Sequence, residues 1–447
     1  MVVNRDKNPT AQETFMQMAQ AAGLRGRLLV TIGLLILARL GVFIPVPGID
    51  RDSFAQAIQN SPVIGFLDIF TGGGLSAVGI FALGIIPYIN ASIIMQLLTA
   101  AIPALENLQK NEGEAGRRKI SQITRYVAAG WSVVQSLGIT IGLLRPYAIN
   151  YGLIFVAETT LALTAGSLFV MWLSELITER GIGNGASLLI FINIVAILPK
   201  TLGDTIEFAQ AGGQENVGKV IILLLVFLVM IVGIVFVQEG TRRIPIISAR
   251  RQVGKRLYRE RTNYLPLRLN QGGVMPIIFA SAVLILPGSL AGVASNAGTE
   301  GFLGTVSQVL TQVATYLRPN GPTPWLYVLV YLVLIVFFSY FYASLIVNPV
   351  DMSQNLKKMG ASIPGIRPGR ATSEYVEKVL NRLTFLGAIF LGLVAVVPTA
   401  VESATGVTTF QGLGATSLLI LVGVAIDTAK QIQTYVISQR YEGMVKQ

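Results

Sequence analysis

Isoleucines at matching places in two pairs of similar segments are the residues whose spacing suggests a function. GIIPYINAS (84–92) and GVMPIIFAS (273–281) agree at five of nine positions, and GASLLI (185–190) matches GATSLLI (414–420) with one inserted threonine. If helices bring these isoleucines together, they form an apolar ring that excludes water, and such a constriction blocks ions without a charged filter. The simpler interpretation, that they only pack or face lipid, stays open here. The isoleucines are Ile85, Ile89, Ile190, Ile278 and Ile420.

Side chains that usually carry catalysis are scarce. The chain has no histidine and no cysteine, which removes the commonest general base and the commonest zinc ligands. The GIGNG run (181–185) lacks the Lys-Ser/Thr ending of a phosphate loop, so a turn that caps the next helix is the better interpretation. Arg39, Glu158 and Asp427 are isolated ionisable residues without an evident mechanism. We therefore expect no enzyme, no metal and no cofactor.

The elements that position these residues are membrane-spanning helices. Of the 447 residues, 52% are hydrophobic and 13% are charged, whereas ordinary soluble domains carry about 25% charge. A helix needs about 20 apolar residues to cross a bilayer, and ten continuous apolar runs approach or exceed that length. We expect an all-α polytopic membrane protein. The predicted spans are 27–46, 76–100, 122–144, 152–174, 185–199, 217–237, 272–294, 323–347, 382–401 and 411–436.

The similar segments divide these spans into two halves. They pair the second span with the seventh and the fifth with the tenth, which gives five spans in 27–210 and five in 211–437, between an N-terminal segment (1–26) and a tail (438–447). Because five is odd, the second half is inverted, and inverted repeats meet near the bilayer midplane. A secondary transporter is built in the same way and is the alternative. It would carry ionisable or cation-binding groups where this sequence has isoleucines.

Basic residues orient the chain. The N-terminal segment, the C-terminal tail and the loops on the same side of the membrane hold 28 of the 34 lysines and arginines. The positive-inside rule therefore places both termini in the cytoplasm. Two loops there, 238–270 and 348–382, hold nine and six basic residues. The first alternates basic and apolar residues, which predicts a strand pair or hairpin, and PGIRPG in the second presents Arg367 at a turn. Two interpretations of these loops stay open. Their basic residues only add to the charge that orients the chain in the membrane, or they form a docking surface for acidic groups.

The segment VIGFLDIFTGGGLSAVGIFALGII (63–86) contains a short apolar helix that breaks at three glycines before the second span. Its neighbours resemble a known family. GIFALGIIPYINASIIMQLL (79–98) and WLSELITERGIGNGASLL (172–189) are similar to signature segments of the SecY family, the channel subunits of the Sec protein translocon. The similarity continues in ARLGVFIPVPGID (38–50), EGEAGRRKISQ (112–122), NLKKMGASIPGIRPG (355–369) and SQRYEG (438–443).

The resemblance implies a protein-conducting channel, with a role for each motif. The five isoleucines correspond to the pore ring, and the short helix, about 62–75, to a plug that seals the outer funnel. A lateral gate lies between the second and third spans on one side and the seventh and eighth on the other. The polar residues on or beside these spans, named below as gate residues, are equally explained by hydrogen bonds between helices. The plug residues are Phe66, Leu67, Ile69, Phe70, Gly72, Gly73 and Gly74; the gate residues are Asn90, Gln96 and Asn270; the docking residues are Arg242, Arg243, Arg250, Arg251 and Arg367.

The resemblance also implies partners. These are the small membrane subunits SecE and SecG, the SecA motor ATPase, the ribosome through its rRNA phosphates, signal peptides and nascent chains, and the lipid bilayer. The expected location is a bacterial plasma membrane or a thylakoid membrane.

Overall fold

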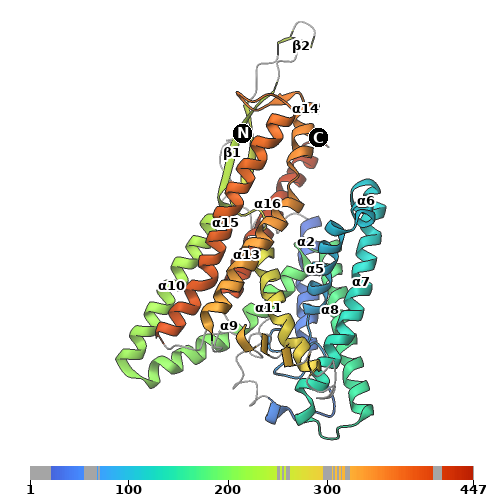
Figure 1. Ribbon diagram of the computed structural model, residues 1–447, viewed down its shortest axis with the longest axis vertical. Coiled ribbons are helices and arrows are strands. Elements are labelled where there is room, and N and C mark those ends of the chain that lie inside the picture. The colour runs from blue at the N-terminus through green and yellow to red at the C-terminus, as the bar shows by residue number, and fades with distance from the viewer. Residues whose placement is uncertain are drawn as a thin grey trace.

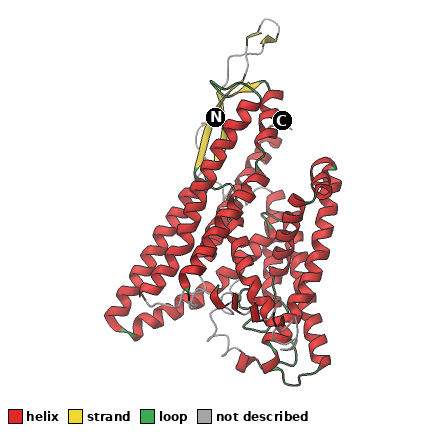
Figure 2. Cartoon of the chain, viewed as in Figure 1, coloured by secondary structure: helices red, strands yellow, loops and turns green. Residues whose placement is uncertain are grey.

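The computed structural model is a bundle of long helices with a small β-sheet at one end (Figures 1 and 2). It describes residues 22–54, 68, 71–248, 252–253, 256–257, 262–294, 305, 308–309, 312–313, 315–317, 323–405 and 415–445. The first half of the chain contributes α2 (Ala22–Val42), α5 (Ile86–Ala101), α6 (Pro103–Asn111), α7 (Gly113–Gly138), a π-helical turn η1 (Ile139–Leu143), a 3₁₀ turn η2 (Arg145–Tyr147), α8 (Leu153–Arg180) and α9 (Gly185–Ala211). The second half contributes α10 (Gly213–Glu239), α11 (Met275–Ala294), α13 (Pro324–Ile346), α14 (Pro349–Lys358), α15 (Arg370–Thr405) and α16 (Ala415–Val445).

One packing scheme recurs in the two halves. In the first half α5 packs on α7, α7 on α8, α8 on α9, and α2 on both α8 and α9. In the second half α11 packs on α13, α13 on α15, α15 on α16, and α10 on both α15 and α16. Each of these pairs therefore has its counterpart in the other half, with α2, α5, α7, α8 and α9 corresponding to α10, α11, α13, α15 and α16. This scheme is what an internal repeat of five helices predicts.

The described helices are long and apolar, as expected of a polytopic membrane protein. Six of them are long and apolar enough to cross a membrane, or seven if α5 and α6, which meet at a bend of 103°, form one span. A shorter apolar helix covers Met275–Leu284. The count of ten spans is compatible with this set and stays a prediction.

One predicted boundary was wrong, and several helices continue past the predicted spans. The second span was predicted from residue 76, but residues 72–85 form turns and α5 begins at Ile86, with Pro87 in its first turn. This segment pairs with the chain after α2 instead of forming a helix: Val46 donates to the Val78 carbonyl at 2.9 Å and Ile80 donates to the Ile44 carbonyl at 2.8 Å. The approach is close enough at Gly79 that a Cβ there would lie 2.1 Å from the carbonyl oxygen of Val42. The helices α9, α15 and α16 extend beyond the predicted spans, because their polar turns continue the helix outside the apolar segment.

The predicted hairpin in loop 238–270 is confirmed. Strand β1 (Thr241–Ser248) pairs antiparallel with β4 (Thr262–Arg268), and a two-stranded piece, β2 (Gln252–Val253) with β3 (Arg256–Leu257), lies between them in sequence. A third strand, β5 (Ala361–Ser362), comes from loop 348–382 and pairs with the other edge of β1. The two basic loops therefore form one folded unit, with an apolar core that includes Ile244, Leu267, Ile363 and Val376.

Candidate functional site

The structure gathers the five candidate ring isoleucines in one apolar cluster. Ile85 caps the N-terminus of α5 and Ile89 lies one turn further, while Ile190, Ile278 and Ile420 lie on α9, α11 and α16. Four of them are almost completely buried, with at most 4% of their surface exposed, and Ile89 packs against the same cluster. Elements from both halves of the chain therefore contribute to this cluster. The arrangement supplies a seam of apolar contacts that contains no charge.

The three glycines lie in a tight turn beside this cluster. Gly72 and Gly73 have φ angles of +69° and +85°, a region that favours glycine. The main-chain N–H of Gly73 donates to the carbonyl of Asp68, and the Asp68 carboxylate accepts from the N–H of Ser76 at 2.8 Å. The glycines thus form the predicted break before α5. The other candidate plug residues, Phe66, Leu67, Ile69 and Phe70, lie outside the described residues.

Arg39 has a partner that the sequence did not reveal. It lies near the end of α2, and its Nη1 donates to the carbonyl oxygen of Gly72 at 2.7 Å. Its guanidinium carbon lies 5.8 Å from the ring centroid of Phe43. Asp427, the second isolated charge, lies 3.7 Å from Arg268 in an ion pair whose side chains are half exposed. Neither residue needs to reach the membrane surface on its own.

The proposed gate helices meet across the two halves. Helix α7 and its continuation η1 contact α11, and α11 packs on α13. Asn90 and Asn270 are buried. The Asn270 amide donates to the carbonyl of Gly273 at 2.8 Å, and the Gln96 amide donates to Ser92 one turn earlier at 3.3 Å. These two bonds are local, so they do not tie one gate helix to another.

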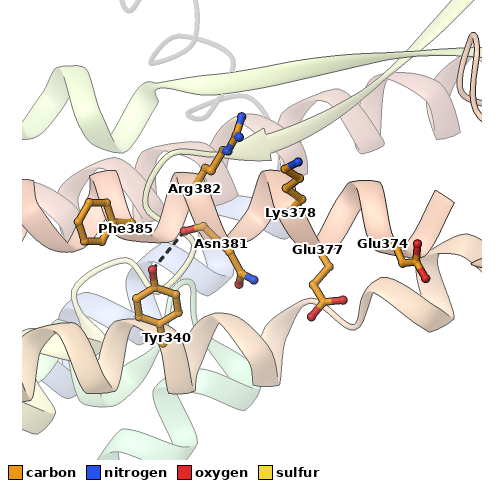
Figure 3. A pocket seen from close by; sticks show the side chains of 7 residues that line it. All are labelled: Tyr340, Glu374, Glu377, Lys378, Asn381, Arg382 and Phe385. Carbon is orange, nitrogen blue, oxygen red and sulfur yellow. Dashed lines mark hydrogen bonds between the residues drawn. The ribbon is translucent and has the colours of Figure 1, made fainter. Parts of the chain in front are cut away.

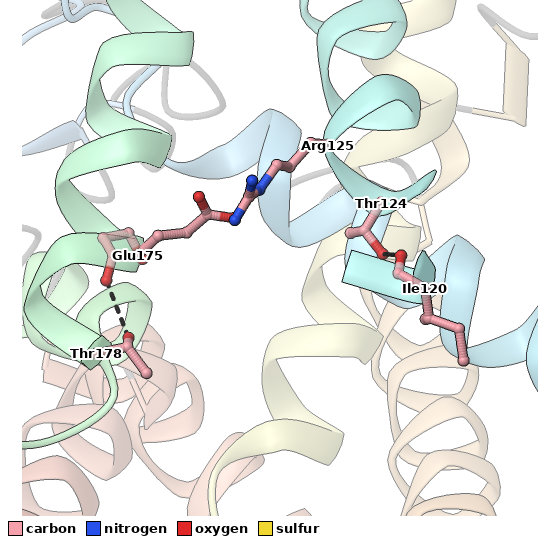
Figure 4. Close-up of polar contacts among 6 residues, drawn as sticks. Ile120, Thr124, Arg125, Glu175 and Thr178 are labelled. Carbon is pink, nitrogen blue, oxygen red and sulfur yellow. Dashed lines mark hydrogen bonds and ion pairs between the residues drawn. The ribbon is translucent and has the colours of Figure 1, made fainter. Parts of the chain in front are cut away.

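An ion pair that sequence reasoning missed joins α7 to α8 (Figure 4). Arg125 Nε donates to Glu175 Oε1 at 2.7 Å, and the carboxylate is mostly buried, with 17% of the Glu175 side chain exposed. The two residues are 50 positions apart, and each lies in a helical pattern that predicts no partner. Together with the packing of α7 on α8, the pair joins these two helices of the first half.

The predicted docking arginines lie on the folded basic unit. Arg242 and Arg243 are exposed on β1, and Arg367 is exposed in the PGIRPG turn. Positive φ angles at Gly365 and Gly369, +78° and +111°, confirm that turn. Thr372 donates to the Arg367 carbonyl at 2.9 Å, and Ser353 donates to the Gly369 carbonyl at 2.7 Å, so the turn is held on α14 and α15. Arg250 and Arg251 lie outside the described residues.

A groove of about 460 Å³ lies between α13 and α15 (Figure 3). Tyr340 donates to the carbonyl of Asn381 across it at 3.4 Å. Acidic and basic side chains both line the groove, and none of the ring isoleucines does, so it is separate from the central cluster. The lining residues are Tyr340, Glu374, Glu377, Lys378, Asn381, Arg382 and Phe385.

Comparison with known proteins identifies the family. The SecY family model matches residues 79–429. A protein translocase subunit SecY from Synechocystis is 77% identical over 447 residues, which cover all of both chains. The chain belongs to the SecY family.

Solved SecY-type channels share the fold. A structure described by the role of the SecY plug domain in stabilising the closed channel matches with a TM-score of 0.64 at 17% identity, and covers 91% of each chain. Sec61 in the canine ribosome-channel complex matches with a TM-score of 0.60 at 18% identity, again over 91% of each chain. The all-α polytopic fold predicted from the sequence is therefore confirmed as the SecY channel fold, and the transporter alternative is not favoured.

Proposed function

We propose that this chain forms the channel of a Sec translocon, which conducts unfolded secretory polypeptides across a membrane and releases transmembrane segments sideways into lipid. The observation that carries the proposal is the burial of the repeat isoleucines in one cluster drawn from both halves. An apolar constriction stays dry and excludes ions. Apolar contact is also non-directional, so the same ring accommodates the varied side chains of an extended polypeptide.

In this proposal the turn at Gly72–Gly74 connects the plug to α5. The plug occupies the outer side of the ring in the resting channel and leaves it when a polypeptide enters. A signal helix would enter where α7 and η1 meet α11. Uncharged polar residues suit that seam, because an amide exposed to lipid costs far less than a charge.

Partners supply the driving force and the orientation. The folded basic unit of loops 238–270 and 348–382 would face the cytoplasm, with both termini, in a bacterial plasma membrane or a thylakoid. Exposed arginines on β1 and in the PGIRPG turn suit the SecA motor and the phosphates of ribosomal RNA. SecE and SecG would complete the membrane part of the translocon.

A reconstitution assay tests the proposal. Proteoliposomes that contain the chain with SecE, SecG and SecA should protect an added precursor protein from protease in the presence of ATP, and should not take up radiolabelled small solutes. Solute uptake without protection of the precursor would favour the transporter alternative. A cysteine at Arg367 (Arg367→Cys), in a chain that has no other cysteine, should react with an impermeant maleimide from the cytoplasmic side only. Labelling of this cysteine from outside intact cells would show that the loop faces the opposite side of the membrane.

A further inference from the structure

The glycine turn before α5 is held by a set of hydrogen bonds. Its internal hydrogen bonds run from the Gly73 N–H to the Asp68 carbonyl at 2.9 Å, from the Ser76 N–H to the Asp68 carboxylate at 2.8 Å, and from the Leu75 N–H to the Thr71 hydroxyl at 3.2 Å. The turn continues into the next segment, because the N–H groups of Ala77 and Gly79 donate to the carbonyls of Gly73 and Gly74, each at 3.0 Å. That segment is in turn held beside the end of α2, where Ile80 donates to the Ile44 carbonyl at 2.8 Å. A displacement of the turn therefore also breaks the bonds from Ala77 and Gly79.

The contact from Arg39 joins the turn to α2. A guanidinium that donates to a carbonyl at 2.7 Å makes a short, charge-assisted hydrogen bond, which is stronger than a neutral one. The residue is half-buried in an apolar helix, where an arginine without a partner would be costly. The closed arrangement therefore satisfies the turn and the arginine together.

The turn is also pressed against the helix that carries part of the ring. A Cβ on Gly72 would lie 2.3 Å from Arg39 Nη1 and 2.7 Å from Asn193 Oδ1. Asn193 lies on α9, three residues after Ile190, so it is about one helical turn from a ring residue. Arg39 thus holds the turn in a narrow space between α2 and α9, beside the ring.

We propose that Arg39 is the positioning residue that latches the glycine turn in the resting channel, and that opening requires the Arg39–Gly72 hydrogen bond to break. The proposal rests on the proposed function, because it assigns a latch to the channel's resting state. It predicts that weaker donors at position 39 favour the displaced turn. A lysine keeps the charge but replaces the fixed guanidinium fork with a single ammonium, so its effect should be smaller than that of glutamine.

The test measures the position of the turn directly. Ala77 is half-buried just after the turn, and Ala77→Cys places one thiol in a cysteine-free chain. In vesicles without motor or precursor, Arg39→Gln should raise the rate at which this thiol reacts with a soluble maleimide by about tenfold, equivalent to about 1.4 kcal/mol. Arg39→Lys should raise it less. Arg25→Gln, at the exposed start of the same helix, should leave the rate unchanged.

A second variant separates the latch from general loss of structure. Gly72→Ala crowds the same contact and also strains the backbone, because the φ angle of Gly72 is +69°. Arg39→Gln and Gly72→Ala should each raise the labelling rate. Adding Arg39→Gln to Gly72→Ala should raise it no further, because the hydrogen bond is already broken. Additive effects, or an unchanged rate in Arg39→Gln and Arg39→Lys proteins that unfold at the parent temperature, would overturn the proposal. The labelling needs no translocation, so its failure is distinct from failure of the proposed function, which the precursor assay reports.

Discussion

Substituting a ring isoleucine with asparagine should open the resting channel. Ile420 is 0% exposed and lies in the apolar cluster with Ile190 and Ile278. Burying an isoleucine contributes about 1.5–3 kcal/mol, and the closed state loses this contribution in Ile420→Asn. Burying a carboxamide without a partner costs about 1–3 kcal/mol more. In an open, water-filled pore neither effect operates.

The closed state should therefore lose roughly 2.5–6 kcal/mol relative to the open state, which is an upper range because neighbouring side chains relax. Even the lower end, about 2.5 kcal/mol, corresponds to about a 60-fold rise in the ratio of open to closed channels. Planar-bilayer conductance of the reconstituted channel without precursor measures this ratio. Export of precursors with defective signal sequences should rise in parallel, because less free energy is needed from the signal to open the channel.

Two controls make the measurement specific. Ile420→Val keeps the site apolar and should leave the resting conductance close to that of the parent. Ile221→Asn places the same amide on α10, where the isoleucine is 57% exposed on the outside of the bundle, and it should not raise conductance. If Ile420→Asn and Ile278→Asn membranes are both as tight as the parent, these isoleucines are packing residues and the seal lies elsewhere.

Three further predictions follow from the structure. Arg367→Glu should sharply reduce SecA-driven translocation and change the free energy of unfolding by no more than about 0.5 kcal/mol, because the side chain is exposed; full activity would contradict the docking role. Cysteines at the paired positions Ile247 and Ser362 should form a disulfide under mild oxidation, seen as a mobility shift without reductant; failure to do so would argue against the β1–β5 pairing. Gly166→Ala should lower the temperature at which the detergent-solubilised protein unfolds, because the new Cβ would lie 2.2 Å from the Ile80 carbonyl oxygen. Gly130→Ala has open space around the new Cβ and should leave that temperature unchanged or raise it. Equal shifts in the two variants would refute the close packing at Gly166.

Local patterns in the sequence predicted much of the fold. Apolar runs located the long helices, alternation in loop 238–270 predicted the β1–β4 hairpin, and the proline-glycine pairs predicted the turn at Arg367. The repeat also selected the isoleucines that the structure buries together. These predictions succeeded because each depends on periodicity or turn chemistry within a few residues, or on internal similarity.

Contacts between distant segments were not predictable in this way. The partner of Arg39 is a main-chain carbonyl 33 residues away, and a carbonyl leaves no mark on the residue type. The pairing of Ile247 with Ser362 joins two loops that lie far apart in the sequence and carry no pattern that predicts their contact. The segment before α5 has an apolar composition that favours a helix, but its backbone hydrogen-bonds to residues 44–46 after α2 instead. Tertiary packing decided all three.

The two kinds of contact at the centre of this channel suit different tasks. In the proposed channel the isoleucines would seal without regard to orientation, so a ring of them would close around any passing side chain but would favour no particular resting geometry. A hydrogen bond from a guanidinium is directional and is satisfied in one arrangement only. In our proposal Arg39 holds the turn and the isoleucines form the seal, so separate residues would supply the specific closed state and the adaptable seal. Weakening Arg39 should therefore alter how often the channel opens, whereas altering the isoleucines should also change how tightly it fits the polypeptide inside it.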